Sequence, residues 1–338
     1  MKELFDYPLL HHNTFGMDVK ASRFVEYGSV EELQDFLKSR KGEMGKWLHI
    51  GRGSNLLFTG DFDGVILHSA IAGISVVRED ENTLDVRVGA GVVWDDFVAY
   101  AVDHQWYGAE NLSLIPGEVG ASAVQNIGAY GVEAKDLIVT VDAVEVSTGC
   151  IRSFSADECE YSYRQSIFKN QLKGKYIVTH VTYRLKKQPD WKLDYGNIRA
   201  ELEKEGCELT LENLRNAIVR IRREKLPDPE VTGNAGSFFM NPVISSAQFD
   251  ALKEAYPDVP HYPAGDGLVK VPAGWMIDRC GWKGRSLGHA GVHPRQALVL
   301  VNLGGATAAE VMNLAEAVVK SVKDKFGIEI HPEVNYIR

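Results

Sequence analysis

The sequence lacks the features that mark several protein classes. It has only four cysteines, none of which forms a CxxC pair or has histidine at zinc-finger spacing, so we expect structural thiols and no metal site. The first segment has no apolar core flanked by basic residues, and no apolar run approaches the roughly 18 residues of a membrane helix. We therefore expect neither a secretory signal nor a membrane span, and a cytoplasmic location follows as the default.

The sequence also lacks an excess of positive charge, because 46 Asp and Glu residues outnumber 37 Lys and Arg residues and the formal net charge is -9. This balance argues against non-specific binding to nucleic acid or to a membrane surface, and an anionic ligand must meet a local basic cluster. The 338 residues, 45% of them hydrophobic, are enough for two or three domains with a real core. We expect a monomer with no obligate protein partner.

Proline and periodicity indicate where the chain divides. A predicted helix over residues 211–223 ends just before Leu226-Pro227-Asp228-Pro229, and two prolines in three residues mark a domain boundary. Further on, Thr307 with Glu310 predicts the start of a long amphipathic helix, which Gly327 ends. We expect the last strand over residues 328–331 and its return to an earlier sheet.

Two glycine-rich stretches are candidates for ligand binding. The first, GRGSNLL over residues 51–57, follows a predicted strand and could present backbone N–H groups to an anion, or could be a plain tight turn. It is not a dinucleotide fingerprint, because Leu56 stands where the third glycine belongs and no helix is predicted to follow. The second stretch covers residues 115–131, where interspersed apolar residues favour backbone packed against a flat or phosphorylated ligand over a floppy loop.

Single residues elsewhere allow a structural and a functional interpretation. Arg164, among aromatic and apolar neighbours, is either part of a buried structural pair or a clamp on a carboxylate. Ser237, in GNAGSFF, is either a turn residue or a proton donor aimed at a flat ring, and it is not a hydrolase elbow. Lys283 belongs to a local basic pair, whereas Glu333 would ordinarily be a solvated carboxylate.

Taken together, several motifs closely resemble the UDP-N-acetylenolpyruvoylglucosamine reductase family. In chain order they are GRGSNLL, PGEVGASAVQNIGAYG, YRQSIFK, LPDP with GNAGSFFMNP, PAGWMID with GWKG, and HPEV. The resemblance covers nearly the whole chain, and LDYGN looks like the tyrosine loop of the type I branch. It implies an α+β fold: a p-cresol methylhydroxylase-type two-part FAD-binding domain plus a C-terminal α/β substrate-binding domain. The implied limits are residues 1–70 and 71–225 for the two FAD-binding parts, the second rejoined by 328–338, and 226–327 for the substrate domain.

The resemblance also implies a reaction and its residues. FAD would be bound non-covalently, NADPH would reduce it, and flavin N5 would deliver hydride to the enolpyruvyl ether of UDP-N-acetylglucosamine. Arg164 and Glu333 would stabilise the enolate and Ser237 would protonate it, which are the groups that the chemistry demands. The matching FAD contacts are Gly51, Arg52, Gly53, Ser54, Asn55, Leu56, Pro116, Gly117, Gly120, Ser122, Asn126, Gly128 and Arg222. The matching substrate contacts are Tyr130, Tyr195, Lys225, Asn241, Lys283 and Gln296.

One residue departs from the family pattern, because Asn335 stands where many relatives carry arginine. A charged contact at the flavin edge is therefore not expected here. Two rival interpretations remain: an FAD-dependent alcohol or sugar oxidoreductase of the same fold, and a non-catalytic nucleotide-binding module. The first would have no need of Ser237, and the second would need neither Ser237 nor Arg164.

Overall fold

The computed structural model of the protein describes residues 1–40 and 45–338. Contacts within the chain divide it into two units, each assembled from three segments. Unit 1 comprises Met1–Tyr7, Ala21–Arg52 and Asp63–Arg222, and unit 2 comprises Pro8–Lys20, Gly53–Phe62 and Arg223–Arg338. The main part of unit 2 thus begins close to the boundary predicted at residues 226–229, but two short N-terminal segments also belong to it.

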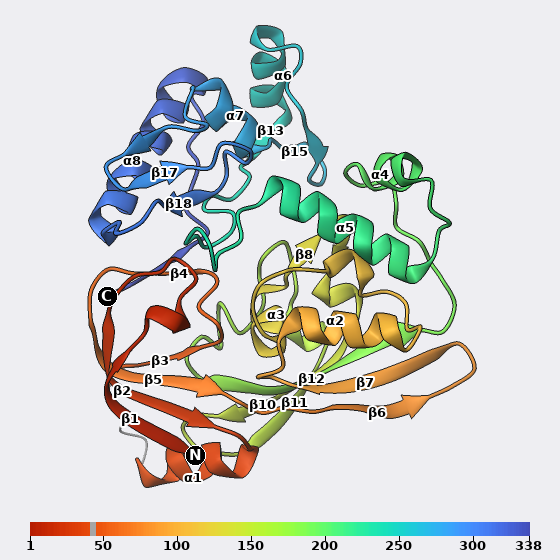
Figure 1. Ribbon diagram of the computed structural model, residues 1–338, viewed down its shortest axis with the longest axis vertical. Coiled ribbons are helices and arrows are strands. Elements are labelled where there is room, and N and C mark those ends of the chain that lie inside the picture. Colours follow the sequence, from red (N-terminus) through yellow and green to blue (C-terminus); the bar gives the residue numbers. More distant parts are fainter. Residues whose placement is uncertain (41–44) are drawn as a thin grey trace. The chain divides into compact units, whose positions relative to one another are not determined.

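Unit 1 is built on two larger sheets (Figure 1), and β8 (Gly128–Ala129) with β9 (Val132–Glu133) forms a further two-stranded sheet. The four-stranded sheet has the order β1-β2-β5-β3, with bounds Lys2–Pro8, Lys20–Tyr27, Phe62–Ser69 and Trp47–Ile50. The five-stranded sheet has the order β11-β10-β12-β7-β6, with bounds Ile151–Ser155, Ile138–Glu145, Tyr176–Lys186, Thr83–Gly89 and Ile74–Glu79. β3 runs parallel to β5, whereas all neighbours in the five-stranded sheet are antiparallel.

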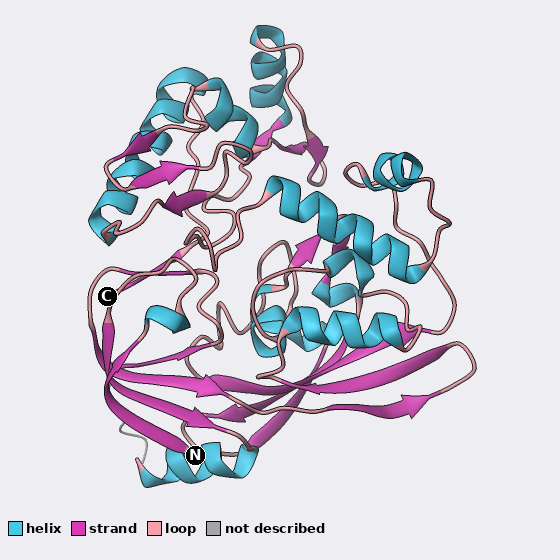
Figure 2. Cartoon of the chain, in the orientation of Figure 1, coloured by secondary structure: helices cyan, strands magenta, loops and turns pink. Residues whose placement is uncertain are grey.

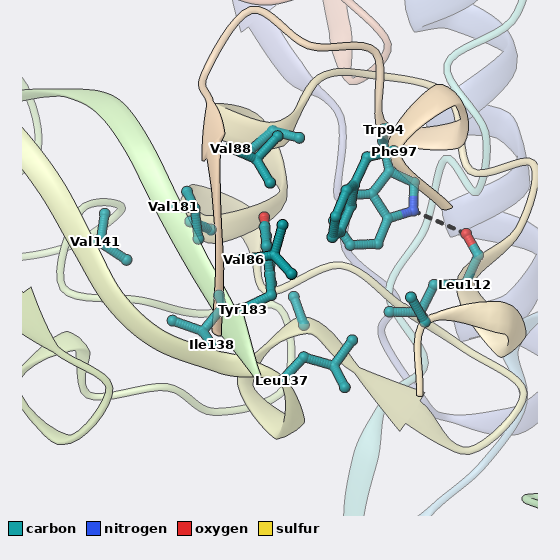
Figure 3. Close-up of a cluster of buried hydrophobic side chains, with 14 of the residues drawn as sticks. Val86, Val88, Trp94, Phe97, Leu112, Leu137, Ile138, Val141, Val181 and Tyr183 are labelled. Atoms are coloured by element: carbon teal, nitrogen blue, oxygen red, sulfur yellow. Dashed lines mark hydrogen bonds between the residues drawn. The ribbon is translucent and has the colours of Figure 1, made fainter. Parts of the chain in front are cut away.

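Two helices, α2 (Trp94–Asp103) and α3 (Val119–Gln125), pack on one face of the five-stranded sheet (Figure 1). Figure 3 shows the core between them, in which the Trp94 indole N–H donates to the carbonyl of Leu112 at 2.8 Å. The ring of Phe97 stacks on Tyr183 with 5.0 Å between centroids. Because these rings are fully buried, they supply much of the apolar area that holds helix and sheet together.

The other helices of unit 1 form two further clusters. α1 (Val30–Ser39) buries Leu33, Phe36 and Leu37 in a cluster that includes residues of both sheets. α4 (Ile198–Glu205) and α5 (Leu211–Lys225) share a cluster of their own, against which Tyr130 and Trp191 pack. The helix predicted over residues 211–223 is confirmed.

Unit 2 contains short sheets and three helices, coloured by type in Figure 2. Its sheets have the orders β13-β15-β14, β16-β17-β18 and β19-β4. The strand bounds are Leu56–Phe58 (β4), Val243–Ser245 (β13), Tyr262–Pro263 (β14), Leu268–Lys270 (β15), Ser286–Leu287 (β16), Ala290–Val292 (β17), Leu300–Asn302 (β18) and Asn335–Ile337 (β19). The helices are α6 (Ser246–Ala255), α7 (Ala273–Arg279) and α8 (Ala308–Phe326). The prediction for α8 is confirmed at both ends, since Thr307 and Glu310 form a capping box and Gly327 ends the helix at φ +67°.

The last strand differs from the sequence prediction. It begins at Asn335, not at residue 328, and it pairs in parallel with β4 inside unit 2. Ile328 and Ile330 are buried, which explains the misleading apolar alternation, while the backbone just beyond them pairs with the segment around Phe239. The terminal residues therefore join β4, and not the 71–225 segment that they are expected to rejoin.

Within residues 1–40 and 45–338 no helix combines the length and apolarity needed to cross a membrane. In the same residues no group of three or more His, Cys, Asp or Glu side chains is arranged to hold a metal ion.

Candidate active site

The first glycine turn connects β3 to β4, and no helix follows it, as predicted. Gly53 has φ +67°, and a Cβ placed there would lie 2.1 Å from the carbonyl oxygen of His12. Glycine is thus required at this position by the backbone packed against it. This packing requires glycine whether or not an anion binds at the turn.

The second glycine stretch is an ordered element of unit 1. It contains α3, whose Val119 and Ala123 are buried, so the floppy-loop alternative is wrong. A Cβ on Gly120 would lie 2.9 Å from that of Ala90, and the Gly120 N–H donates to the Ala90 carbonyl at 2.9 Å. Here too a close approach of backbone within the protein accounts for glycine.

Two predicted FAD contacts in this stretch already have partners inside the protein. The hydroxyl of Ser122 lies 2.6 Å from that of Tyr183 and donates to the Val119 carbonyl at 2.7 Å. The side chain of Asn126, buried with a left-handed backbone, donates to Glu133 Oε2 at 3.0 Å and to the Ser162 carbonyl at 2.9 Å. Both side chains therefore hold the segment in shape, and their contact with a cofactor stays a prediction.

Arg164 is brought to the end of the same stretch. It is half-buried, has φ +57°, and donates to the carbonyls of Asn126 at 3.2 Å and Gly128 at 2.9 Å. Its guanidinium carbon lies 5.5 Å from the ring centroid of Tyr163. Neutral carbonyl acceptors orient a guanidinium without neutralising its charge, so these two bonds fix the direction of the Arg164 side chain.

A second guanidinium, that of Arg222, lies close enough to Arg164 for the two positive charges to interact. Arg222 donates to the Leu114 carbonyl at 3.2 Å and is hydrogen-bonded to the Tyr130 side chain. Burial lowers the pKa of Arg222, and the positive charge of Arg164 acts in the same direction. Tyr130, whose pKa is raised by burial, and Asp95 partly offset this effect. The region gathers two cations, which favours an anionic ligand.

The predicted tyrosine loop packs beside this region. A Cβ on Gly131 would lie 3.4 Å from that of Tyr195, and one on Gly196 would lie 3.3 Å from the Tyr130 ring. Tyr195 itself is 48% exposed, so its ring can be covered by a ligand. The sequence offers no sign of Asn111, a buried residue whose amide donates to the carbonyls of both Tyr130 and Lys192.

In unit 2 the structure brings together the two backbone segments that carry Ser237 and Glu333. Phe239 forms an antiparallel bridge with Pro332, and the Glu333 N–H donates to the Phe238 carbonyl at 2.8 Å. Ser237 is exposed while Phe238 and Phe239 are buried, so the two rings anchor the turn that carries the serine.

The first glycine turn also contacts the segment that carries Glu333. The Asn55 side chain donates to the Glu333 carbonyl at 3.5 Å, and Asn335 donates to the Asn55 carbonyl. Asn335 thus has a structural role in joining the terminal strand to the turn. The predicted residues Asn55, Ser237 and Glu333 consequently come from three distant parts of the sequence to one place in unit 2.

Two of the predicted substrate contacts in unit 2 lie beside α7. Asn241 accepts the N–H of Ala273 at 2.9 Å, and the Gln296 side-chain oxygen would lie 3.3 Å from a Cβ on Gly274. Lys283, in contrast, pairs with Asp278 near the other end of that helix at 3.3 Å. Lys225 is the exposed last residue of α5. The substrate roles of these residues stay predictions.

Family models and known proteins identify the kind of site. One model, described as an FAD binding domain, matches residues 21–155, and another, the C-terminal domain of UDP-N-acetylenolpyruvoylglucosamine reductase, matches residues 228–337. A reductase of this name from Bacteroides fragilis is 59% identical over 331 residues, or 98% of this chain and 99% of that protein. The chain belongs to the UDP-N-acetylenolpyruvoylglucosamine reductase family. A relative of the same name from Porphyromonas gingivalis is 49% identical over 98% of both chains.

Solved structures agree on the fold. The UDP-N-acetylenolpyruvylglucosamine reductase of Thermus caldophilus matches with a TM-score of 0.69 at 21% identity, covering 100% of this chain and 98% of that one. Substrate-bound p-cresol methylhydroxylase matches with a TM-score of 0.50 at 13% identity, covering 94% and 82%. With the family models, these matches confirm the predicted α+β, p-cresol methylhydroxylase-type fold and an FAD-dependent oxidoreductase of this family.

Proposed function

We propose that the protein reduces the enolpyruvyl ether of UDP-N-acetylglucosamine to UDP-N-acetylmuramate, with NADPH as reductant, in the synthesis of peptidoglycan precursors. The observation that carries the proposal is the 59% identity to a reductase of this name across nearly the full length of both chains. Arg164 and Arg222 of unit 1 support it, and so do the adjacent segments of unit 2 that carry Ser237 and Glu333, because the reaction needs a cation, a carboxylate and an acid.

The residues of unit 1 suit an anionic cofactor such as FAD. Arg164 and Arg222 lie beside the second glycine stretch, where each donates to backbone carbonyls, and the positive charge of Arg164 acts on Arg222. Positive charge gathered in one region favours a pyrophosphate or a carboxylate as ligand. FAD held here would supply the redox chemistry that moves hydride from NADPH to the enol ether.

The chain's own residues would handle the charge and the proton. Arg164, oriented by two backbone carbonyls, would bind the pyruvyl carboxylate and stabilise the enolate as negative charge develops on it. Glu333 would assist that polarisation. The hydroxyl of Ser237 would give its proton to the α-carbon, which completes the addition of hydride and proton across the double bond.

An anaerobic titration tests this proposal. We expect the purified protein to be yellow, to release FAD on denaturation, and to lose its flavin absorbance when NADPH is added without oxygen. Adding the enolpyruvyl substrate should restore the absorbance and yield UDP-N-acetylmuramate, identified by mass. Reduced flavin that oxygen reoxidises rapidly, but that the enolpyruvyl substrate leaves unchanged, would contradict the proposal and favour an oxidoreductase acting on another compound.

A further inference from the structure

His68 lies beneath the first glycine turn and has a carboxylate at each ring nitrogen. It is on β5, directly opposite Ile50 of β3, the residue that precedes Gly51. Nδ1 lies 3.1 Å from Glu26 Oε2, and Nε2 lies 3.0 Å from Glu118 Oε1. A carboxylate only accepts hydrogen bonds, and neutral imidazole has only one N–H, so both contacts together require the imidazolium.

Glu118 connects this histidine to both glycine-rich stretches. It belongs to the second stretch, immediately before α3, and is only 6% exposed. Its Oε2 would lie 3.0 Å from a Cβ on Gly51, so the carboxylate packs directly against the first residue of the first turn. A buried carboxylate is costly unless a positive charge accompanies it, and His68 supplies that charge.

The other groups around His68 do not take over this role. His49, on β3, accepts or donates a 2.7 Å bond with the hydroxyl of Tyr27, and burial together with the charge of His68 lowers its pKa to about 3. Burial also raises the pKa of Tyr27, which stays neutral. The ring of Phe24 stacks at 6.0 Å from that of His68. Hydrogen bonds and charge from Glu118 and Glu26 both favour the protonated form of His68.

We propose that His68 is a positioning residue for FAD. As an imidazolium, His68 holds Glu118 against Gly51 and cancels the negative charge of Glu118 beside the pyrophosphate. The inference rests on the proposed function, in which the turn beginning at Gly51 receives that pyrophosphate. Neutral His68 would leave a buried carboxylate next to an anionic ligand, and like charges repel. FAD binding and protonation of His68 therefore favour each other.

The sign of the pH dependence follows from the environment of His68. Burial disfavours the charged ring, but hydrogen bonds and charge from Glu118 and Glu26 outweigh it and raise its pKa above the ordinary value. FAD affinity should be highest below that raised pKa and should fall as the pH rises through it. A single linked proton limits the change in Kd to about tenfold per pH unit.

The test measures the Kd of FAD for the full chain, stripped of flavin and retitrated, between about pH 6 and 9. Quenching of FAD fluorescence reports binding without any turnover. We expect the wild-type Kd to rise with pH, His68→Gln to bind weakly at every pH, and Glu118→Gln to bind tightly at every pH. His180→Gln, which removes a half-buried histidine of β12 in the same unit, is the matched control and should keep the wild-type profile.

Each outcome has a definite meaning. A wild-type Kd independent of pH, or a His68→Gln profile with the wild-type slope, overturns the inference while leaving the proposed function intact. Full chain that binds no FAD at any pH overturns the proposed function itself. If His68→Gln does not fold, Glu118→Gln decides alone, because retention of the wild-type slope in that variant contradicts the role of the carboxylate.

Discussion

Replacing Ser237 by alanine should separate the two half-reactions of the proposed cycle. Ser237 is exposed, and its turn is held by buried Phe238, whose N–H donates to the Leu298 carbonyl and whose carbonyl accepts from Glu333. None of these bonds involves the serine hydroxyl. We therefore expect the substitution to change the free energy of unfolding by no more than the roughly 0.5 kcal/mol typical of a surface site.

The chemical consequences fall on one half-reaction only. Reduction of FAD by NADPH needs no proton donor over the enol ether, so its rate should stay near the wild-type value. Reoxidation by the enolpyruvyl substrate should slow by the roughly 10²–10⁴-fold typical of a lost general acid, which corresponds to about 3–5 kcal/mol. Ser237→Cys keeps a proton at nearly the same place and should recover part of this loss.

Anaerobic stopped-flow absorbance measures each half separately, with the melting temperature as the check on folding. Ser286→Ala, which removes an exposed serine hydroxyl from the same unit, is the matched control and should leave both rates unchanged. Equal slowing of both halves in Ser237→Ala would refute the reasoning. The serine would then support the turn or the shared cleft, and would not be the acid.

Three further substitutions test other parts of the site. Tyr195→Ala removes a ring that is 48% exposed. Losing its contact should raise the KM for the UDP-sugar in steady-state assays by a factor that corresponds to about 1–3 kcal/mol. An unchanged KM would mean that the loop does not contact this substrate. Gly53→Ala forces a Cβ to within 2.1 Å of the His12 carbonyl and should lower the melting temperature even without flavin; a loss confined to FAD affinity would contradict this packing argument. Asp95→Asn breaks the paired bonds from Arg215, at 2.8 and 2.9 Å, which overcome burial and lower the pKa of Asp95. The lowered pKa means that ionised Asp95 stabilises the fold above about pH 4, and that this contribution is lost as the pH falls. In urea titrations the free energy of unfolding should therefore fall less on acidification in the variant than in the wild type.

Elements with strong periodicity could be predicted from the sequence. α8 carries its start and stop signals in its own sequence. α3 could not be predicted, because VGASAVQ contains a glycine, a serine and two valines, which are weak helix formers, and almost no amphipathic pattern. Its helix depends on the close approach of Gly120 to Ala90, which is a tertiary contact. The position of β19 was missed for the same kind of reason, since its partner β4 lies far away in sequence.

The candidate site follows a similar division. The resemblance could supply Ser237 and Glu333 as a pair, and in the structure the Glu333 N–H donates to the Phe238 carbonyl, which joins their two segments. Residues that act through long-range partners carried no signal: Asn111 joins two backbone carbonyls 19 and 81 positions away, and His68 meets carboxylates 42 and 50 positions away. A single histidine or asparagine in a sequence does not reveal such partners, because they are set by how distant segments pack together.

The glycines show why a motif and a binding role must be tested separately. At Gly53 and Gly120 a side chain would collide with the protein's own backbone or with Ala90, so glycine would be needed there even if no ligand bound nearby. Gly51 is different, because the atom nearest to its missing Cβ is a carboxylate oxygen of Glu118, whose charge depends on its partner for compensation. A side chain at Gly53 or Gly120 should therefore first destabilise the fold. A side chain at Gly51 should instead disturb the Glu118–His68 pair, so Gly51→Ala should alter the pH dependence of FAD affinity more than the melting temperature. The same fluorescence titration measures this, and a large fall in melting temperature with an unchanged pH profile would place Gly51 with the other two.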